Sequence, residues 1–170
     1  MKINPFKLER YFARHEFSAP YLLSCSDCEP LSMNELLRMA SDDSLELWNN
    51  LKLSYTESQG HPLLRNEIAT IYETIKPEDV VVVSPEEGIF ISMNILLETG
   101  DHVICTFPGY QSLYEIAKSI GCEVSKWEPT EKGNFAIEDL HELIKDNTRL
   151  IIINFPHNRS EEHTSELQSP

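Results

Sequence analysis

The spacing of apolar and polar positions along the chain changes at about residue 80. Before that point apolar residues recur at helical spacing, separated by short polar or proline-containing stretches. Helices are predicted over 5–16 and 61–74. Between them, a further helix is predicted to begin at the capping sequence of Ser32, and a short helical turn is predicted over 43–48. Residues 18–31 hold several Pro, Ser and Cys, and we expect them to form an extended arm.

After residue 79 short apolar runs alternate with helical patterns. Val80 to Val83 is a continuous β-branched run, which favours a strand that is covered on both faces. The other predicted strands are 102–106, 122–127 and 149–154, and the predicted helices are 84–100, 110–120 and 137–145. This order predicts an α/β fold: a mostly parallel sheet with helices on both faces, preceded by an N-terminal arm with helices.

Composition and charge narrow the class of protein. Apolar residues at 41% and charged residues at 25% are typical of a soluble globular chain. The formal charge of -14 argues against nucleic acid and anionic membranes as partners. The N-terminus lacks the apolar stretch of a signal peptide, so we expect a cytoplasmic location. Cys25 and Cys28 have zinc-site spacing but no second ligand pair, so we expect reduced thiols and no metal.

The final segment, 159–170, departs from the pattern of the preceding chain. It is polar, has no periodicity, and resembles the in-frame translation of a sequencing-adapter oligonucleotide. We therefore treat it as artefactual and leave it out of the fold prediction. We expect the protein's own sequence to continue beyond Asn158.

Candidate chemistry follows the predicted strands, at the end of a parallel sheet where ligands bind. Glycine fingerprints for dinucleotides and the phosphate-loop lysine motif are missing from the sequence, which removes the usual nucleotide-binding classes. Ser84 begins a helix whose N–H groups suit a phosphate, although the same residues also form an ordinary capping box. Two roles are open for Tyr110: its ring stacks on a planar heterocycle, or it packs in the hydrophobic core. The Asn158 amide suits either a ligand oxygen or a turn.

Taken together, these motifs resemble those of fold-type-I aminotransferases of class I/II. Their order and spacing match the family over about residues 18–158. The matching segments are Tyr55 to Gly60 with Leu64-Arg65 (Tyr-x-x-x-x-Gly…Leu-Arg), Gly100 to Val103 (Gly-Asp-x-Val), Pro108 to Tyr110 (Pro-x-Tyr), and Asn154 to Asn158 (the start of Asn-x-Pro-His-Asn-Pro-x-Gly).

The resemblance implies pyridoxal 5′-phosphate as the cofactor. It implies that Tyr110 stacks on the pyridine ring and that Asn158 hydrogen-bonds the phenolic oxygen of that ring. Ser84 and the amides of Glu86 and Glu87 would hold the phosphate. Family members usually carry small or hydroxyl residues where Pro85 and Glu86 stand, so this chain departs from the family in its phosphate clamp.

Further roles that the resemblance implies involve a homodimer and the substrate. Tyr55 would reach the phosphate of the cofactor bound by the other subunit, and Ser26 would lie near the substrate carboxylate. The implied domains are an N-terminal arm with a small-domain segment at 1–48, and a partial cofactor-binding large domain at 49–158, followed by the artefactual tail at 159–170.

The function that the resemblance implies is transfer of an amino group between an amino acid and a 2-oxo acid. In the family the lysine that forms the resting Schiff base follows the Asn158 motif, so we expect no catalytic residue in this chain and an inactive fragment. Two alternatives stay open: a carbon–sulfur lyase or other eliminating enzyme of the same fold, and a non-catalytic binding module.

Overall fold

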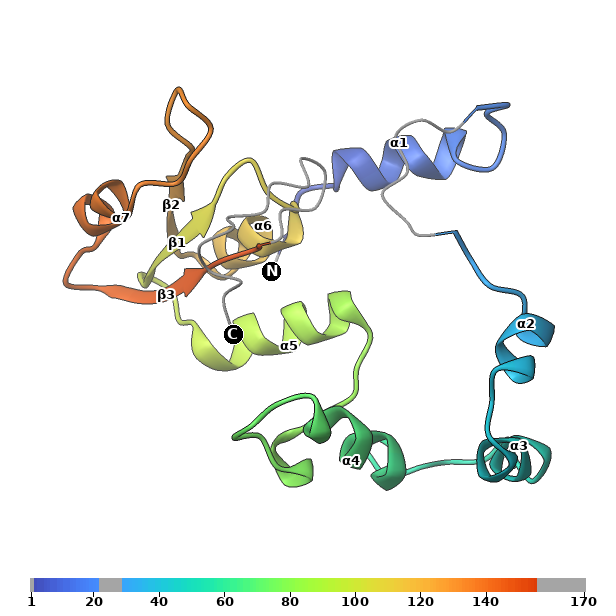
Figure 1. Ribbon diagram of the computed structural model, residues 1–170. Helices are drawn as coiled ribbons and strands as arrows, with labels where there is room; N and C mark the ends of the chain where they lie inside the picture. The colour runs from blue at the N-terminus through green and yellow to red at the C-terminus, as the bar shows by residue number, and fades with distance from the viewer. Residues whose placement is uncertain (1, 22–28, 156–170) are drawn as a thin grey trace. The chain divides into compact units, whose positions relative to one another are not determined.

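The structure is a computed structural model that describes residues 2–21 and 29–155 (Figure 1). The chain divides into two compact units. One, which we call the sheet unit, combines the N-terminal segment up to residue 26 with the chain from residue 84 onward. The other, the helical unit, spans 27–83. Over the described residues, none of the helices has the length and apolar character needed to cross a membrane.

The sheet unit has an α/β architecture. Within its described residues, three parallel strands form a sheet in the order β2-β1-β3, which confirms the predicted fold class. A helix follows β1 and another follows β2, as crossover connections between parallel strands require. The elements are α1 (Lys7–His15), α5 (Pro85–Leu96), β1 (His102–Thr106), α6 (Ser112–Ile120), β2 (Glu123–Trp127), α7 (Ile137–Leu143) and β3 (Thr148–Ile152).

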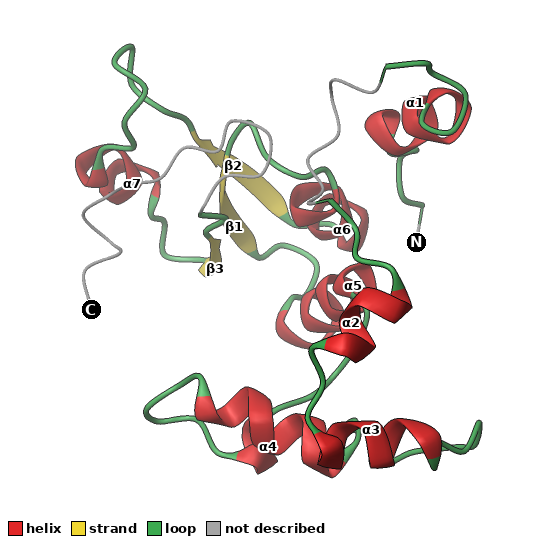
Figure 2. Ribbon diagram, turned by 45° about the vertical axis from the view of Figure 1, so that its right-hand side comes forward, coloured by secondary structure: helices red, strands yellow, loops and turns green. Residues whose placement is uncertain are grey.

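Neighbouring residues of the central strand β1 pack on opposite faces of the sheet, because side chains alternate along a strand. Val103 is fully buried against α5 and α6. Ile104 is also fully buried, but packs with Trp127 and with Leu140 of α7. Figure 2 shows α5 and α6 on one side of the sheet and α7 on the other. The predicted covering of both faces is therefore confirmed.

The helices of the sheet unit are shorter than predicted. α5 ends at Leu96, and Leu97 already has extended backbone angles, so Gly100 does not end the helix. α6 begins at Ser112, because the turn through Pro108 and Tyr110 precedes it. The predicted stop at Gly121 is confirmed, since this residue has the left-handed conformation that ends many helices.

The helical unit contains short helices joined by irregular segments. The predicted capping box is confirmed: the Ser32 N–H donates to Glu35 Oε2 at 2.8 Å, and the Glu35 N–H donates to Ser32 Oγ at 3.3 Å. The helix predicted over 61–74 ends at Thr70. Its elements are α2 (Met33–Arg38), α3 (Asp42–Asn49), α4 (Pro62–Thr70) and the 3₁₀-helix η1 (Pro77–Asp79).

The predicted buried strand over 80–83 is wrong for this structure. The segment belongs to no described strand, and the side chain of Val81 is 57% exposed. Val82 donates its N–H to the Gln59 carbonyl at 2.8 Å, a local loop contact. A β-branched run indicates that a segment prefers an extended conformation, but a strand also needs a neighbouring strand to pair with. Within the described residues no strand pairs with 80–83.

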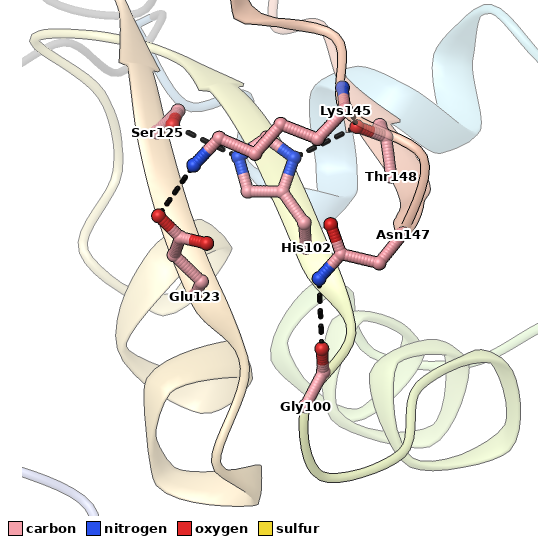
Figure 3. Close-up of polar contacts among 7 residues, drawn as sticks. All are labelled: Gly100, His102, Glu123, Ser125, Lys145, Asn147 and Thr148. Atoms are coloured by element: carbon pink, nitrogen blue, oxygen red, sulfur yellow. Dashed lines mark hydrogen bonds and ion pairs between the residues drawn. The ribbon is translucent and has the colours of Figure 1, made fainter.

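Polar contacts join the three strands at the amino end of the sheet (Figure 3). His102 begins β1 and is fully buried. Its Nε2 lies 2.8 Å from Ser125 Oγ on β2, and its Nδ1 lies 2.8 Å from Thr148 Oγ1 on β3. Beside it, Lys145 forms an ion pair with Glu123. One imidazole therefore connects both edge strands to the central strand.

Candidate functional site

The start of α5 provides the first part of the candidate site. Ser84 has an extended backbone and caps the helix, and Pro85 occupies its first turn. The Ser84 N–H donates to Glu87 Oε2 at 3.4 Å, and the Gly88 N–H closes the first turn on the Ser84 carbonyl at 2.9 Å. The predicted helix start at Ser84 is thus confirmed.

The backbone donors at this helix start are few. The first N–H groups of a helix have no intrahelical acceptor and lie at the positive end of its dipole. Pro85 has no N–H, so the amides of Glu86 and Glu87 are the donors that this turn offers to an anion. Acidic side chains at both positions stabilise the helix but repel an anion.

Tyr110 provides the second part, beyond the carboxyl end of β1. Phe107 and Pro108 are joined by a cis peptide bond. At Gly109 a Cβ atom would lie 2.7 Å from the Thr106 carbonyl oxygen, so only glycine allows the chain to fold back this closely over the strand end. The turn leaves Tyr110 half-buried immediately before α6.

Two carboxylates lie beside the Tyr110 hydroxyl. It donates to Glu9 Oε1 at 2.9 Å, and Glu86 is the second acidic neighbour. Ser112 Oγ in turn donates to Glu86 Oε1 at 3.2 Å. Burial first, and then the bond to Glu9 and the charge of Glu86, raise the pKa of the Tyr110 phenol far above its ordinary range. Tyr110 therefore stays protonated and acts as a hydrogen-bond donor.

The structure thus brings together four of the predicted site residues, on two elements of the sheet unit. Ser84, Glu86 and Glu87 lie at the start of α5, and Glu86 accepts a hydrogen bond from Ser112, two residues after Tyr110. Sequence reasoning missed Glu9, which lies 101 positions from Tyr110 along the chain. No local spacing signals a contact of that separation.

The remaining predicted residues are placed differently. Ser26 and Asn158 lie outside the described residues. Tyr55 belongs to the helical unit, where its side chain is fully exposed. The segment that leads to Asn158 is anchored at its start, since the Asn154 N–H donates to Thr106 Oγ1 at 3.3 Å.

Comparisons with known proteins agree on the family. The family model for aminotransferase class I and II matches residues 29–160. An aspartate aminotransferase of Pyrococcus horikoshii is 31% identical over 137 residues, which are 76% of this chain and 33% of that protein. The chain belongs to the class I and II aminotransferase family, whose cofactor is pyridoxal 5′-phosphate.

Solved structures show the same fold. A PLP-dependent aminotransferase from Streptococcus suis matches with a TM-score of 0.82 and 31% identity, over 93% of this chain and 44% of that one. The PLP-dependent cyclase OrfR matches with a TM-score of 0.77 and 27% identity, over 93% and 42%. The chain spans about a third of the length of the aspartate aminotransferase that it matches.

Proposed function

We propose that this chain is the N-terminal part of an enzyme that uses pyridoxal 5′-phosphate to move an amino group between an amino acid and a 2-oxo acid. The observation that carries the proposal is the hydrogen bond from Ser112 Oγ to Glu86 Oε1 at 3.2 Å, which joins the start of α5 to the start of α6, where Tyr110 lies two residues before Ser112 beyond the carboxyl end of β1. Membership of the aminotransferase family supports the same reaction class.

The described residues fit the cofactor at its ring and, through backbone groups, at its phosphate. Tyr110 offers a half-buried ring for stacking on the pyridine. Ser84 and the amides of Glu86 and Glu87 would hold the phosphate at the positive end of the α5 dipole. The Glu87 carboxylate accepts from the Ser84 N–H, which directs its charge away from the proposed phosphate site.

The cofactor, when bound, supplies an electron sink for the carbanion that forms when the substrate loses its α-proton. The residues of this chain would bind and orient it. Tyr110 would fix the plane of the ring, and Asn158 would donate to the phenolic oxygen. Tyr110 keeps its proton and is no general base, so proton transfer would fall to a lysine that follows Asn158 in the family.

The whole enzyme would be a homodimer in which Tyr55 reaches the phosphate bound by the other subunit. The exposure of Tyr55 supports this role, because a side chain that reaches into a second subunit must leave its own. Ser26 would lie near the substrate carboxylate. We further propose a cytoplasmic enzyme of a biosynthetic process, without nucleic acid or membrane partners.

Reading the gene beyond the codon of Asn158 and assaying the encoded protein tests the proposal. We expect a continued aminotransferase sequence with a lysine that borohydride links to pyridoxal phosphate, and amino transfer from an amino acid to a 2-oxo acid. The 170-residue chain is the matched control, and we expect it to show neither. A genuine stop codon after residue 170, or amino transfer by the 170-residue chain alone, would contradict the proposal.

A second candidate is cyclisation or elimination on the same cofactor. The similarity to the PLP-dependent cyclase OrfR over 93% of the chain favours it. Both reactions begin with loss of the α-proton, so the ring and phosphate contacts proposed above serve either one. Product analysis of the same assay separates them: amino transfer consumes the 2-oxo acid, whereas elimination or cyclisation leaves it unused.

A further inference from the structure

The N-terminal segment forms a series of contacts with the start of α6. Ile3 packs against the core cluster that α5 and α6 share. Asn4 Nδ2 donates to Glu115 Oε2 at 2.7 Å, although the two residues are 111 positions apart. Glu115 is buried, which opposes its ionisation, but the hydrogen bonds from Asn4 and Lys118 outweigh burial and hold the pKa of this carboxyl below its usual value. The contact is therefore made to a charged acceptor.

Gln111 fixes the register of this segment. Its Oε1 accepts from the Lys7 N–H at 2.9 Å, and its Nε2 donates to the Pro5 carbonyl at 3.3 Å. Lys7 is the first residue of α1, and its N–H has no acceptor within the helix. The Gln111 side chain supplies that acceptor, so a residue beside Tyr110 caps α1 from a distance of 104 positions.

Glu9 follows in the first turn of α1, where an acidic side chain also suits the helix dipole. Because Gln111 sets where α1 begins, it also sets where the Glu9 carboxylate lies. That carboxylate accepts from the Tyr110 hydroxyl at 2.9 Å. The bond to Glu9 fixes the hydroxyl end of the Tyr110 side chain, and with it the direction in which the ring extends from the backbone.

From these contacts we propose that Glu9 is a positioning residue for the cofactor site: residues 3–9 form a latch on α6, and Glu9 holds the Tyr110 ring where it stacks on pyridoxal phosphate. The inference rests on the proposed function, since it assigns a purpose to the orientation of that ring. In this proposal Glu9 acts on the cofactor only through Tyr110, from whose hydroxyl it accepts a hydrogen bond.

The test uses the full 170-residue chain with Glu9→Ala, Glu9→Gln and, as a control at the C-cap of α1, Glu16→Ala. Two quantities are measured: the NMR resonances of the Tyr110 ring, and the affinity for pyridoxal phosphate from its absorbance. Glu9→Ala should shift and broaden the ring resonances and weaken binding about tenfold, the loss expected for one hydrogen bond to a charged group. Glu9→Gln keeps a neutral acceptor oxygen, so both quantities should lie between those of Glu9→Ala and the wild type, and Glu16→Ala should change neither.

Tyr110→Phe distinguishes the loss of the hydrogen bond between Glu9 and Tyr110 from a loss of affinity caused by misfolding. It keeps the ring and removes the hydroxyl, so Glu9→Ala should have no further effect on binding when combined with it. An additive loss in the double variant, or wild-type ring resonances in Glu9→Ala, would overturn the latch. If the wild-type chain binds no pyridoxal phosphate, the cofactor assignment fails for this chain, while the ring resonances still decide whether Glu9 holds Tyr110.

Discussion

The hydroxyl of Thr106 accepts a hydrogen bond from the backbone N–H of Asn154 at 3.3 Å. Thr106 is the last residue of β1 and is 1% exposed, and Asn154 lies two residues beyond β3. The carboxyl ends of the two strands are therefore joined where the segment toward Asn158 begins. A ligand at this edge would meet a prearranged backbone.

Thr106→Val should loosen this junction. Valine has nearly the same shape but no acceptor oxygen, so the Asn154 N–H loses its partner, at a cost of about 1 kcal/mol because this donor is only partly buried. Urea unfolding measures the loss in the free energy of unfolding, and amide hydrogen exchange at Asn154 should accelerate. Thr106→Ser keeps the hydroxyl and should exchange as slowly as the wild type; equal exchange in the valine variant would show that this bond does not hold the segment.

The His102 contacts predict a stability that falls in mild acid. Burial first, and then the charge of Lys145, lower the pKa of His102 below its ordinary value of 6.5, while Glu123 acts in the opposite direction. The unfolded chain therefore takes up a proton near pH 6.5 that the folded chain refuses. This contribution to stability is complete above pH 6.5 and decreases as the pH falls below it, by at most about 1.4 kcal/mol per pH unit.

Urea unfolding at about pH 7.5 and at about pH 5.5, one above and one below the ordinary histidine pKa, measures the effect. His102→Gln should be less stable at pH 7.5, because Ser125 and Thr148 lose their shared partner, but its stability should change less between the two pH values. A wild-type protein equally stable at both would mean that the imidazole accepts its proton inside the fold.

Much of the fold follows from local pattern. Strand β1 was predicted with its bounds, because the short apolar run Val103 to Cys105 lies between Asp101 and the Phe107-Pro108 turn, which leaves no room for a helix. The helix stop at Gly121 also follows from one residue type. Val81 and its neighbours show the limit: the β-branched run encodes a preference, and pairing depends on a strand elsewhere.

The candidate site was predictable only in part, for the same reason. Tyr110 follows β1, whose end can be found from sequence, and Ser84 begins a helix whose capping residues form a local signal. The contact of Tyr110 with Glu9 depends on how the N-terminal segment folds back, and its register is set by the Gln111 side chain. Contacts over such separations leave no periodic signal in a single sequence.

Gly121 should be less replaceable than Gly100, although both have positive φ, +106° and +95°. A Cβ atom at position 121 would lie 2.9 Å from Thr99 Cγ2, whereas nothing lies within 4 Å at position 100. Thr99 cannot easily give way, because its hydroxyl donates to the Ile120 carbonyl at 2.8 Å. Gly100→Ala should cost only the backbone strain, about 1–2 kcal/mol, and Gly121→Ala measurably more, as judged by thermal unfolding. Equal costs would mean that Thr99 moves freely.

Glu86→Gln should increase the affinity of the chain for pyridoxal phosphate. Under the proposed function the phosphate lies at the first turn of α5, where Glu86 contributes a negative charge and Glu87 has turned away to the Ser84 N–H. Glutamine keeps an acceptor oxygen for the Ser112 hydroxyl and removes the repulsion. Two charges about 6 Å apart in a medium of effective dielectric constant about 40 repel by about 1.4 kcal/mol, so the gain should be about tenfold.

The measurement is a titration of pyridoxal phosphate against wild type and variant, repeated with pyridoxal, which lacks the phosphate. The gain should be confined to the phosphorylated compound and should decrease at high salt, because both follow from a charge–charge repulsion. Asp139→Asn, a change of the same charge in the first turn of α7, is the matched control and should leave both affinities unchanged. An equal gain for pyridoxal would place Glu86 beside the ring instead of the phosphate, and a loss for both compounds would show that its carboxylate is needed to hold Tyr110.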